Sequence, residues 1–233
     1  TPYDIAADLH DSLARLKTDY VDLYLLHRDD PSVPVGPIVE ALNEHRAAGR
    51  IRAFGGSNWT HDRIRAACEY AEAHGLTGFA ASSPNFSLAV RVKEVWAGCV
   101  SISGPAGAAA REFYRQRNMP VFAWSSLAGG FFSGRLTRQN KAEHTDYFDR
   151  IAVDANDCEE NWQRLDRVRE LAAAKGATPA QVALAWVMSE PLNLFALVGC
   201  RTAAEFRDNA AALSLPLTPR EREYLDLRAD SPA

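Results

Sequence analysis

One histidine directly follows an apolar segment, at a place where its imidazole could take part in chemistry. The segment from Val21 to Leu26 is almost continuously apolar, and His27 then leads into charged residues and Pro31. Such a run predicts a parallel strand that is buried on both faces. Because ligands of α/β proteins bind at the carboxyl ends of parallel strands, we expect His27 to belong to a site. The alternative is a histidine that closes the strand and hydrogen-bonds a neighbouring backbone group.

A second candidate site lies near the carboxyl end of the chain, around Arg201. The segment Phe195–Cys200 predicts a strand, and Thr202 with Glu205 predicts a capping box that begins a helix over Ala203–Leu213. A helix amino terminus presents unpaired N–H groups and a partial positive charge, and Arg201 adds a fixed cation just before it. This combination favours the binding of a phosphate group.

The composition limits the class of partner. The chain has 233 residues, 47% of them hydrophobic, and a net charge of -4, which suits one domain with a sizeable core. It has no run of lysine or arginine, which argues against nucleic acid or an anionic membrane as the main partner. No apolar stretch approaches the roughly 20 residues that span a bilayer, and no targeting segment is visible. We therefore expect a small-molecule partner.

The four cysteines are scattered through the chain. Cys68, Cys99, Cys158 and Cys200 form no C-x-x-C pair, a distribution that fits neither a disulfide framework nor a zinc site. We expect free thiols in a reducing cytoplasm and no metal.

Strand patterns alternate with helical patterns along the whole chain. Strands are predicted at Tyr20 to His27, Ile51 to Asn58, Phe79 to Asn85, Pro120 to Ser126 and Phe195 to Cys200. Helices are predicted from Thr1, over Ile38–Ala48, Arg63–His74, Ala108–Arg117, Glu160–Ala174 and Ala203–Leu213, and from Thr178 and Thr218. Strands separated by helices imply right-handed crossovers and a parallel sheet in an α/β domain. A complete eight-stranded barrel needs roughly 250 residues, so five units leave either an open sheet or a barrel without three units.

One long polar segment interrupts the alternation. Leu136 to Asn161 has few apolar residues, and such segments are typical of a lid or a surface insertion. Tyr147, Phe148 and Trp162 could line a pocket for a sugar or an aromatic carbonyl compound.

Four segments resemble successive motifs of the aldo-keto reductases. They are Leu13 to His27, Gly55 to Trp59, Ala123 to Gly130 and Gly199 to Asn209. The resemblance implies a (β/α)8 TIM barrel that binds NADPH, with this chain covering the fourth to eighth strands. The first three β/α units would then lie upstream of Thr1, and residues 1–233 would form a single partial barrel domain.

The resemblance also implies a reaction, the reduction of an aldehyde or ketone to the alcohol. The family uses a tyrosine, a lysine and an aspartate from its early strands together with a histidine, which corresponds to His27 and would hydrogen-bond the substrate carbonyl. A tyrosine, whose pKa is ordinarily about 10, acts as the acid only if a nearby cation lowers that pKa. The four lysines of this chain end no predicted strand. We therefore expect this chain alone to be inactive; the alternative is a catalytically incomplete cofactor-binding or regulatory protein.

By resemblance, the nicotinamide end of the cofactor contacts residues after three predicted strands. Ser57 and Asn58 would hold the carboxamide, although a turn that caps the next helix is the alternative. Ser83 stands where the family commonly has a glutamine, and Asn85 could substitute for it. Trp124 would stack on the nicotinamide ring, and a core tryptophan is the alternative.

The remaining cofactor residues belong to the pyrophosphate and adenine ends. The loop that resembles the pyrophosphate loop contributes Ser125, Leu127 and Gly129. The residues assigned to the 2′-phosphate and adenine end are Gly199, Arg201, Thr202, Glu205 and Asn209. Glu205 has the capping box as its alternative, and Asn209 could be a solvated polar residue. The cation at Arg201 favours NADPH over NADH.

Two other readings stay open. A barrel enzyme of another class, such as a phosphate-handling isomerase or aldolase, would need an acid, a base or a Schiff-base lysine on these strands, and none is found. A truncated barrel would expose unpaired strand edges that favour aggregation or pairing with another chain.

Overall fold

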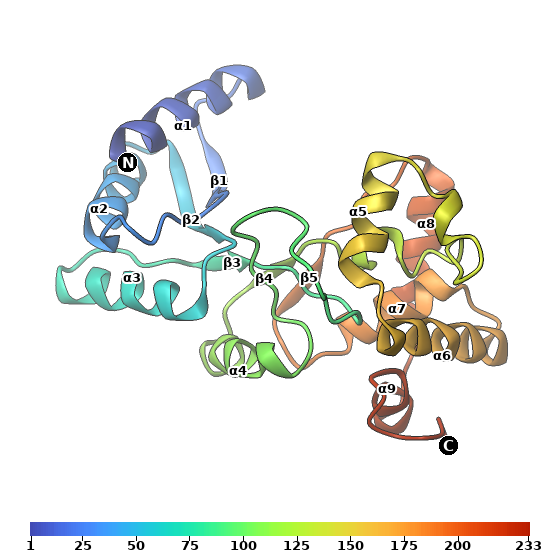
Figure 1. Ribbon diagram of the computed structural model, residues 1–233. Helices are drawn as coiled ribbons and strands as arrows, with labels where there is room; N and C mark the ends of the chain where they lie inside the picture. Colours follow the sequence, from blue (N-terminus) through green and yellow to red (C-terminus); the bar gives the residue numbers. More distant parts are fainter.

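Five short parallel strands form the centre of the molecule. The computed structural model describes residues 1–233, and its sheet has the order β1-β2-β3-β4-β5 (Figure 1). The strands are β1 (Val21–Leu26), β2 (Ile51–Ser57), β3 (Ala81–Ser83), β4 (Val121–Ala123) and β5 (Leu194–Ala196). All neighbouring pairs are parallel. Because neighbours in the sheet are also neighbours in the chain, every crossover advances in the same direction, as in a barrel and unlike a doubly wound sheet.

The chain has nine α-helices, of which six lie between strands, one precedes β1 and two follow β5 (Figure 1). They are α1 (Pro2–Leu16), α2 (Val35–Ala47), α3 (His61–Ala73), α4 (Ala108–Arg117), α5 (Tyr147–Asn156), α6 (Glu159–Lys175), α7 (Pro179–Met188), α8 (Ala203–Ala211) and α9 (Pro219–Leu225). Complete capping boxes begin α1, α7 and α9, at Thr1, Thr178 and Thr218. These three helices therefore begin where the sequence predicts. None of the helices combines the length and the apolar character needed to cross a membrane.

One continuous cluster of 38 buried residues forms the core. It includes Leu9 of α1, Leu42 of α2, Phe54 of β2, Leu165 of α6 and Val182 of α7, all fully buried. The cluster therefore includes residues from the β1–β2 end of the sheet and from the helices between β4 and β5.

Strand β1 differs from its prediction, because it is not buried on both faces. Asp22 is exposed, and the other five residues of β1 are only half-buried. The reason is that β1 is an edge strand, which pairs with β2 and with no other strand. Strand β5 is also an edge, and it ends at Ala196 rather than at Cys200. The sheet is therefore open, with two edges.

The polar segment from Leu136 to Asn161, which the sequence predicts to be a lid or a surface insertion, contains the helix α5. The carboxylate of Asp146 caps this helix by accepting hydrogen bonds from the backbone N–H groups of Phe148 and Asp149. The buried side of α5 consists of Ala152, Ala155 and Asn156. The sequence of α5 is clearly amphipathic, so the helix was missed although its pattern was present.

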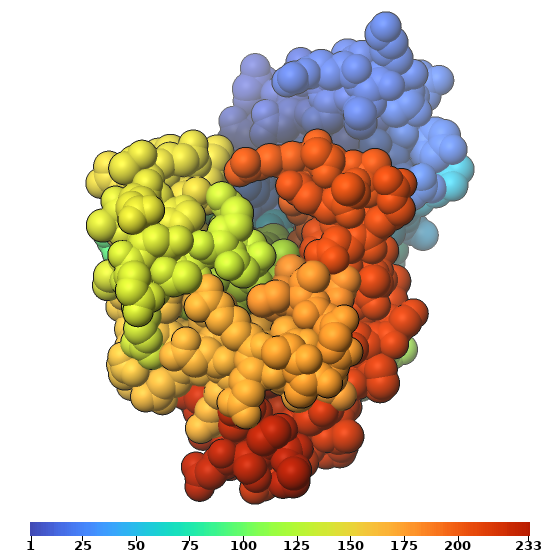
Figure 2. All heavy atoms as spheres, turned by 90° about the vertical axis from the view of Figure 1, so that its right-hand side faces the viewer, coloured from blue at the N-terminus to red at the C-terminus, as the bar shows by residue number.

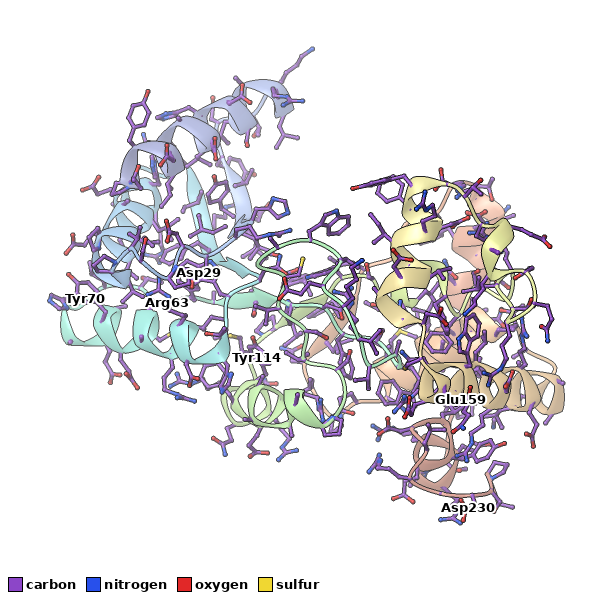
Figure 3. All side chains as sticks on the ribbon, in the orientation of Figure 1. Asp29, Arg63, Tyr70, Tyr114, Glu159 and Asp230 are labelled. Carbon is purple, nitrogen blue, oxygen red and sulfur yellow. The ribbon has the colours of Figure 1, made fainter.

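A buried ion pair fastens the loop after β1 to α3 (Figure 3). Arg63 donates two hydrogen bonds of 2.8 Å to the carboxylate of Asp29, one from Nε and one from Nη2. Arg63 also donates to the backbone carbonyl of Val33 at 3.0 Å. This bidentate arrangement keeps the segment after His27 in a single position.

Candidate functional site

The loop after β4 has an unusual backbone. Four residues between positions 125 and 130 have a positive φ. The values are 50° at Ser125, 53° at Ala128, 70° at Gly129 and 101° at Gly130. This conformation is uncommon for residues other than glycine, and clusters of it mark loops whose course is held by their surroundings. Here the hydroxyl of Ser126 donates to the carbonyl of Ala123 at 2.9 Å. The loop therefore turns back toward the strand that it leaves.

This loop and the amino-terminal part of α8 enclose a pocket of about 570 Å³. Figure 2 shows the hollow between the yellow-green residues after β4 and the orange-red residues of α8. Seven of the residues predicted to bind a cofactor line it: Ser125, Leu127, Gly129, Gly199, Arg201, Glu205 and Asn209. Two segments that are far apart in the sequence are thus brought to one cavity, whose volume is typical of a small-molecule site.

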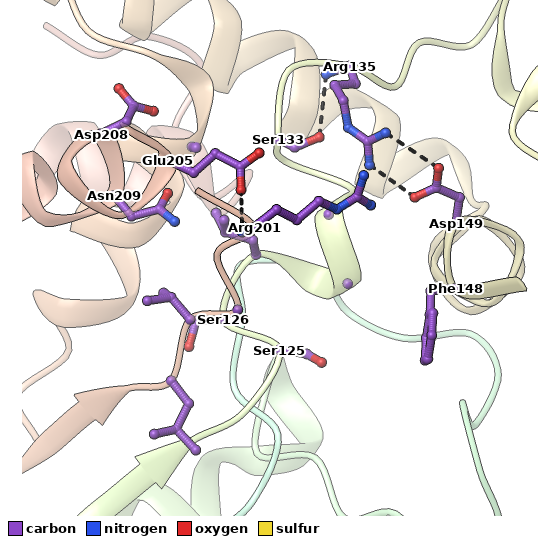
Figure 4. A pocket seen from close by; sticks show the side chains of 17 residues that line it. Ser125, Ser126, Ser133, Arg135, Phe148, Asp149, Arg201, Glu205, Asp208 and Asn209 are labelled. Atoms are coloured by element: carbon purple, nitrogen blue, oxygen red, sulfur yellow. Dashed lines mark hydrogen bonds and ion pairs between the residues drawn. The ribbon is translucent and has the colours of Figure 1, made fainter. Parts of the chain in front are cut away.

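Two arginines line the pocket together with three acidic residues, Asp149, Glu205 and Asp208. Arg135 and Arg201 point toward one another from opposite sides (Figure 4). Arg135 is bound to the carboxylate of Asp149 at 3.0 and 3.5 Å, whereas Arg201 has no carboxylate partner. Burial alone would raise the pKa of Asp149, but hydrogen bonds from Arg135 and His144 outweigh it and hold the pKa below its ordinary value. Asp149 is therefore an anion, and one guanidinium in the pocket is left without a counter-ion.

The amino terminus of α8 differs from the predicted capping box. The hydroxyl of Thr202 accepts the backbone N–H of Glu205 at 3.1 Å, as expected. The carboxylate of Glu205, however, accepts the backbone N–H of Arg201 at 2.6 Å, one residue before the position that a capping box requires. Glu205 therefore fixes the backbone of Arg201. Thr202 caps the helix and does not line the pocket.

Asn209 is half-buried rather than solvated. Its side-chain amide donates to the sulfur of Cys200 at 3.2 Å, and the residue lines the pocket. This bond joins the second turn of α8 to the segment that precedes the helix.

Polar side chains at the ends of β2 and β3 tie neighbouring strands together. Ser57 donates to the carbonyl of Ser83 at 2.9 Å, and Ser83 donates to the carbonyl of Phe122 at 2.7 Å. Asn85 donates to the carbonyl of Trp124 at 2.9 Å. Three of the predicted nicotinamide-binding residues therefore form side-chain bonds across the sheet at its carboxyl end.

Asn58 makes the fourth of these connections. It has a φ of 58°, and its amide donates to the carbonyl of His27 at 3.2 Å. Its side-chain oxygen accepts the backbone N–H of Val100 at 3.2 Å. Asn58 is only 4% exposed, so it holds β1, β2 and the segment around residue 100 in a fixed relation.

Trp124 lies at the end of β4, under an arginine that the sequence does not single out. The guanidinium carbon of Arg91 is 4.5 Å from the centre of the Trp124 ring, and the ring of Trp96 is 6.4 Å away. The indole N–H of Trp124 is buried and has no hydrogen-bond partner. Trp124 is half-buried, which distinguishes it from a core tryptophan such as Trp59.

His27 lies apart from the pocket between the loop after β4 and α8. It is exposed, and it lines a groove of about 620 Å³ that runs between α1 and β1 and includes Tyr24 and Arg28. Burial and the nearby carboxylate of Asp8 raise the pKa of Tyr24, which is the opposite of what an acid catalyst needs. The structure thus places a tyrosine in the same groove as His27, but its surroundings raise the pKa of this tyrosine instead of lowering it.

Arg135 and Asp149 complete the pocket, and neither was singled out in the sequence. Arg135 directly follows the glycine-rich segment that ends at Gly134, a position that offered a signal. Asp149 lies in the segment that was read as an insertion, and it has no sequence signal. Arg91 has none either, because its role depends on how residues 90–100 fold back over Trp124.

Comparisons with known proteins agree on one family. Residues 1–228 match the Aldo/keto reductase family. The "Uncharacterized oxidoreductase YrpG" of Bacillus subtilis is 30% identical over 98% of this chain and 63% of its own length. The "Versiconal hemiacetal acetate reductase" of Aspergillus parasiticus is 29% identical over 92% of this chain and 59% of its own length. The chain therefore spans about three fifths of these relatives.

A solved structure shares the fold. The thermostable aldo-keto reductase Tm1743, crystallised with the inhibitor epalrestat, superposes with a TM-score of 0.69 and 22% sequence identity. The match covers 98% of this chain and 67% of that protein. At this identity the likeness supports the α/β barrel-type architecture.

Proposed function

This chain belongs to the aldo/keto reductase family, and from that premise we propose that it forms the NADPH-binding part of an oxidoreductase that reduces an aldehyde or ketone to the alcohol. The observation that carries the proposal is the pair formed by Arg135 and Arg201 in the pocket of about 570 Å³. Arginines suit phosphate groups because the planar guanidinium group can donate two hydrogen bonds at once. The amino terminus of α8 adds a partial positive charge beside Arg201.

We assign the phosphate-bearing parts of NADPH to this pocket and to Thr202, which lies outside it. Ser125, Leu127 and Gly129 would follow the pyrophosphate, because the left-handed backbone of their loop lies at the pocket wall. The residues placed at the 2′-phosphate and adenine are Gly199, Arg201, Thr202, Glu205 and Asn209. When bound, NADPH supplies the hydride for reduction of the carbonyl group.

The nicotinamide end would lie along the carboxyl ends of β2, β3 and β4. We assign the carboxamide to Ser57, Asn58, Ser83 and Asn85, and the stacking surface to Trp124. These side chains are held in place by the bonds that they make across the sheet. A carbonyl or hydroxyl oxygen has two lone pairs, so the side-chain oxygen of Asn58 can accept a further hydrogen bond beside that from Val100.

His27 is assigned to the carbonyl site, and the acid would come from outside this chain. Among the tyrosines, burial raises the pKa of Tyr24 and holds that of Tyr114 at about 12. No lysine lines the groove beside His27. We therefore propose that three further β/α units complete the barrel at the open edge of β1 and supply the tyrosine, lysine and aspartate. Without them the chain binds the cofactor and does not turn over.

An NADPH titration that follows tryptophan fluorescence tests this proposal. Arg201→Ala should weaken NADPH binding about tenfold or more, since a charge-assisted contact is worth about 1.5–3 kcal/mol. The affinity for NADH, which lacks the 2′-phosphate, should change little in this variant. Arg207→Ala is the matched control, because Arg207 is an exposed arginine on the same helix and does not line the pocket. Equal NADPH affinity in the wild type and in Arg201→Ala would contradict the proposal.

Asp149 competes with a bound anion for Arg135, which leads to a second expected result. Asp149→Asn removes a negative charge from the pocket wall while it keeps a side chain of the same shape. Two charges about 7 Å apart at an intermediate dielectric interact by about 1 kcal/mol, so 2′,5′-ADP should bind about fivefold more tightly. Calorimetric titration at low salt measures this change. Weaker binding by the variant would show that the carboxylate mainly serves to position Arg135.

A further inference from the structure

One carboxylate, that of Asp149, is shared between an arginine and a histidine. Arg135 approaches it with Nη2 at 3.0 Å from Oδ1 and with Nη1 at 3.5 Å from Oδ2 (Figure 4). Nδ1 of His144 lies 3.3 Å from the same Oδ2. Because an ionised carboxylate only accepts hydrogen bonds, Nδ1 carries a hydrogen and donates to it. Nε2 of His144 is therefore the nitrogen at which a further proton would be held.

Asp149 stands between two cavities. The larger is the pocket of about 570 Å³ that we assign to the cofactor, and the smaller has a volume of about 10 Å³. Arg135 and Asp149 line both cavities, whereas His144 lines only the smaller one. His144 therefore does not reach a ligand in the cofactor pocket itself, and its influence on such a ligand passes through the carboxylate that it shares with Arg135.

The loop between Arg135 and His144 is closed by its own hydrogen bonds. The backbone N–H of Thr137 donates to the side-chain oxygen of Asn140 at 2.7 Å, and the backbone N–H of Asn140 donates to the hydroxyl of Thr137 at 3.0 Å. The side-chain amide of Asn140 also donates to the carbonyl of Arg135 at 2.9 Å. The two ends of this loop are thus held beside Asp149 by its internal structure.

The two partners of the shared carboxylate have little competition from other charges. Apart from Arg135 and Asp149, no charged side chain lines the small cavity with His144. The charged neighbours of His144 along the chain are engaged elsewhere or exposed. Lys141 is bound to Asp157 at 2.7 Å, Glu143 is exposed, and the carboxylate of Asp146 caps α5.

A phosphate group at Arg135 would change the balance around Asp149. The guanidinium that turns toward the phosphate gives up part of its bond to Asp149, whose side chain is only 18% exposed. A largely buried carboxylate that loses its counter-ion is costly. A proton on His144 puts a cation back beside this carboxylate, because the imidazole then carries a full charge. By linkage, the phosphate favours the protonated histidine as strongly as the protonated histidine favours the phosphate.

We propose that His144 is a positioning residue of the cofactor pocket, which takes up a proton from solvent when Arg135 binds a phosphate group and then keeps Asp149 as its own partner. This role rests on the proposed function, because it needs a phosphate group of the cofactor at Arg135. Since a proton is gained on binding, a rise in pH opposes binding. The affinity for the phosphate-bearing ligand therefore falls as the pH rises through the range in which histidines titrate.

The test is a calorimetric titration with 2′,5′-ADP at about pH 6 and about pH 8, on either side of the range in which histidines lose their proton. The wild type is compared with His144→Gln, which keeps a neutral hydrogen-bond donor and takes up no proton. The phosphate groups of the ligand also titrate, at about pH 6, and the comparison of the two proteins removes this contribution. One added charge near the pocket should change the affinity about fivefold. From the lower to the higher pH, the wild type should therefore lose about fivefold more affinity than the variant.

Two further variants show whether the effect passes through Asp149. His61→Gln is the matched control, because His61 also lies beside an aspartate, with Nε2 at 3.6 Å from the carboxylate of Asp62, but it lies on α3 and does not line the cofactor pocket. This variant should keep the full pH dependence of the wild type. Asp149→Asn should lose the part that depends on His144, and an unchanged pH dependence in Asp149→Asn would overturn the proposal.

Nuclear magnetic resonance of the imidazole groups gives a direct readout of the proton. The signal of His144 is assigned by its absence from His144→Gln, and its protonated fraction at neutral pH should rise when 2′,5′-ADP is added. Binding of 2′,5′-ADP with the same pH dependence in the wild type and in His144→Gln would overturn the role of His144 and leave the proposed function standing. A folded chain that does not bind 2′,5′-ADP at either pH would contradict the proposed function, and the role of His144 would fall with it.

Discussion

Replacing Asp29 with alanine is expected to lower the free energy of unfolding by about 3 kcal/mol or more, as found when one partner of a buried ion pair is removed. Asp29 is 7% exposed and Arg63 is 21% exposed. The variant would leave the guanidinium of Arg63 largely buried, with only backbone carbonyls as acceptors. Urea unfolding followed by circular dichroism measures the loss as a lower midpoint at an unchanged slope.

A surface ion pair in the same part of the chain is the matched control. Asp22 accepts from Arg52 at 2.6 Å, but the two side chains are 75% and 63% exposed. Exposed pairs contribute only about 0–1 kcal/mol, so Asp22→Ala should hardly change the midpoint. A loss of similar size in both variants would show that burial does not decide the contribution of Asp29.

Replacing Gly55 with alanine is expected to cost about 3 kcal/mol of stability. Gly55 is paired with Ala81 in the neighbouring strand. A Cβ on Gly55 would overlap the carbonyl oxygen of Ala81 and lie 3.0 Å from a methyl group of Leu25. The first obstacle is backbone in the middle of the sheet, so it cannot rotate away, and overpacking of this kind typically costs 1–3 kcal/mol or more. Thermal or urea unfolding measures the effect.

Gly199→Ala is the comparison for Gly55. A Cβ at Gly199 meets no atom within 4 Å, and its φ is not positive. The substitution should therefore leave stability within about 0.5 kcal/mol of the wild type. If Gly55→Ala unfolds at the same urea concentration as Gly199→Ala, the close approach of β2 and β3 described above is wrong.

The sequence predicts the first residue of a helix well where a side chain caps the amino terminus of that helix. Thr1, Thr178 and Thr218 all begin helices with complete capping boxes, because the cap is a local interaction among residues three apart. At Thr202 the helix also begins as predicted, but the carboxylate of Glu205 accepts the backbone N–H of Arg201 instead of that of Thr202. Local patterns specify that a helix begins there, and the surrounding chain decides which N–H the carboxylate accepts.

Burial was harder to predict than element type. The run from Val21 to Leu26 forms a strand as expected, but the strand is at an edge and is half-buried. An apolar run shows that a strand is suited to a buried position. Whether the strand is in fact buried depends on whether other strands lie on both sides of it. Helix α5 was missed although its sequence is amphipathic, because the segment around it was interpreted from its overall polarity.

Part of the lining of the candidate pocket was singled out from the sequence. Family motifs led to seven residues that the structure gathers into one pocket. Arg91 and Arg135 were missed because isolated arginines carry no motif, and their meaning arises from Trp124 and Arg201, which are distant in sequence. The assignment of each residue to a part of the cofactor stays a prediction, as does the role of His27.

The sequential order of the sheet has a consequence for how the chain acquires its structure. Each strand pairs only with the strands immediately before and after it in the chain. The first three pairings each close a single intervening α-helix and its loops, whereas the pairing of β4 with β5 closes three α-helices, α5 to α7. The entropy cost of loop closure rises only slowly with the length of the closed segment. Among these five strands, each pairing can form as soon as the next strand has been synthesised.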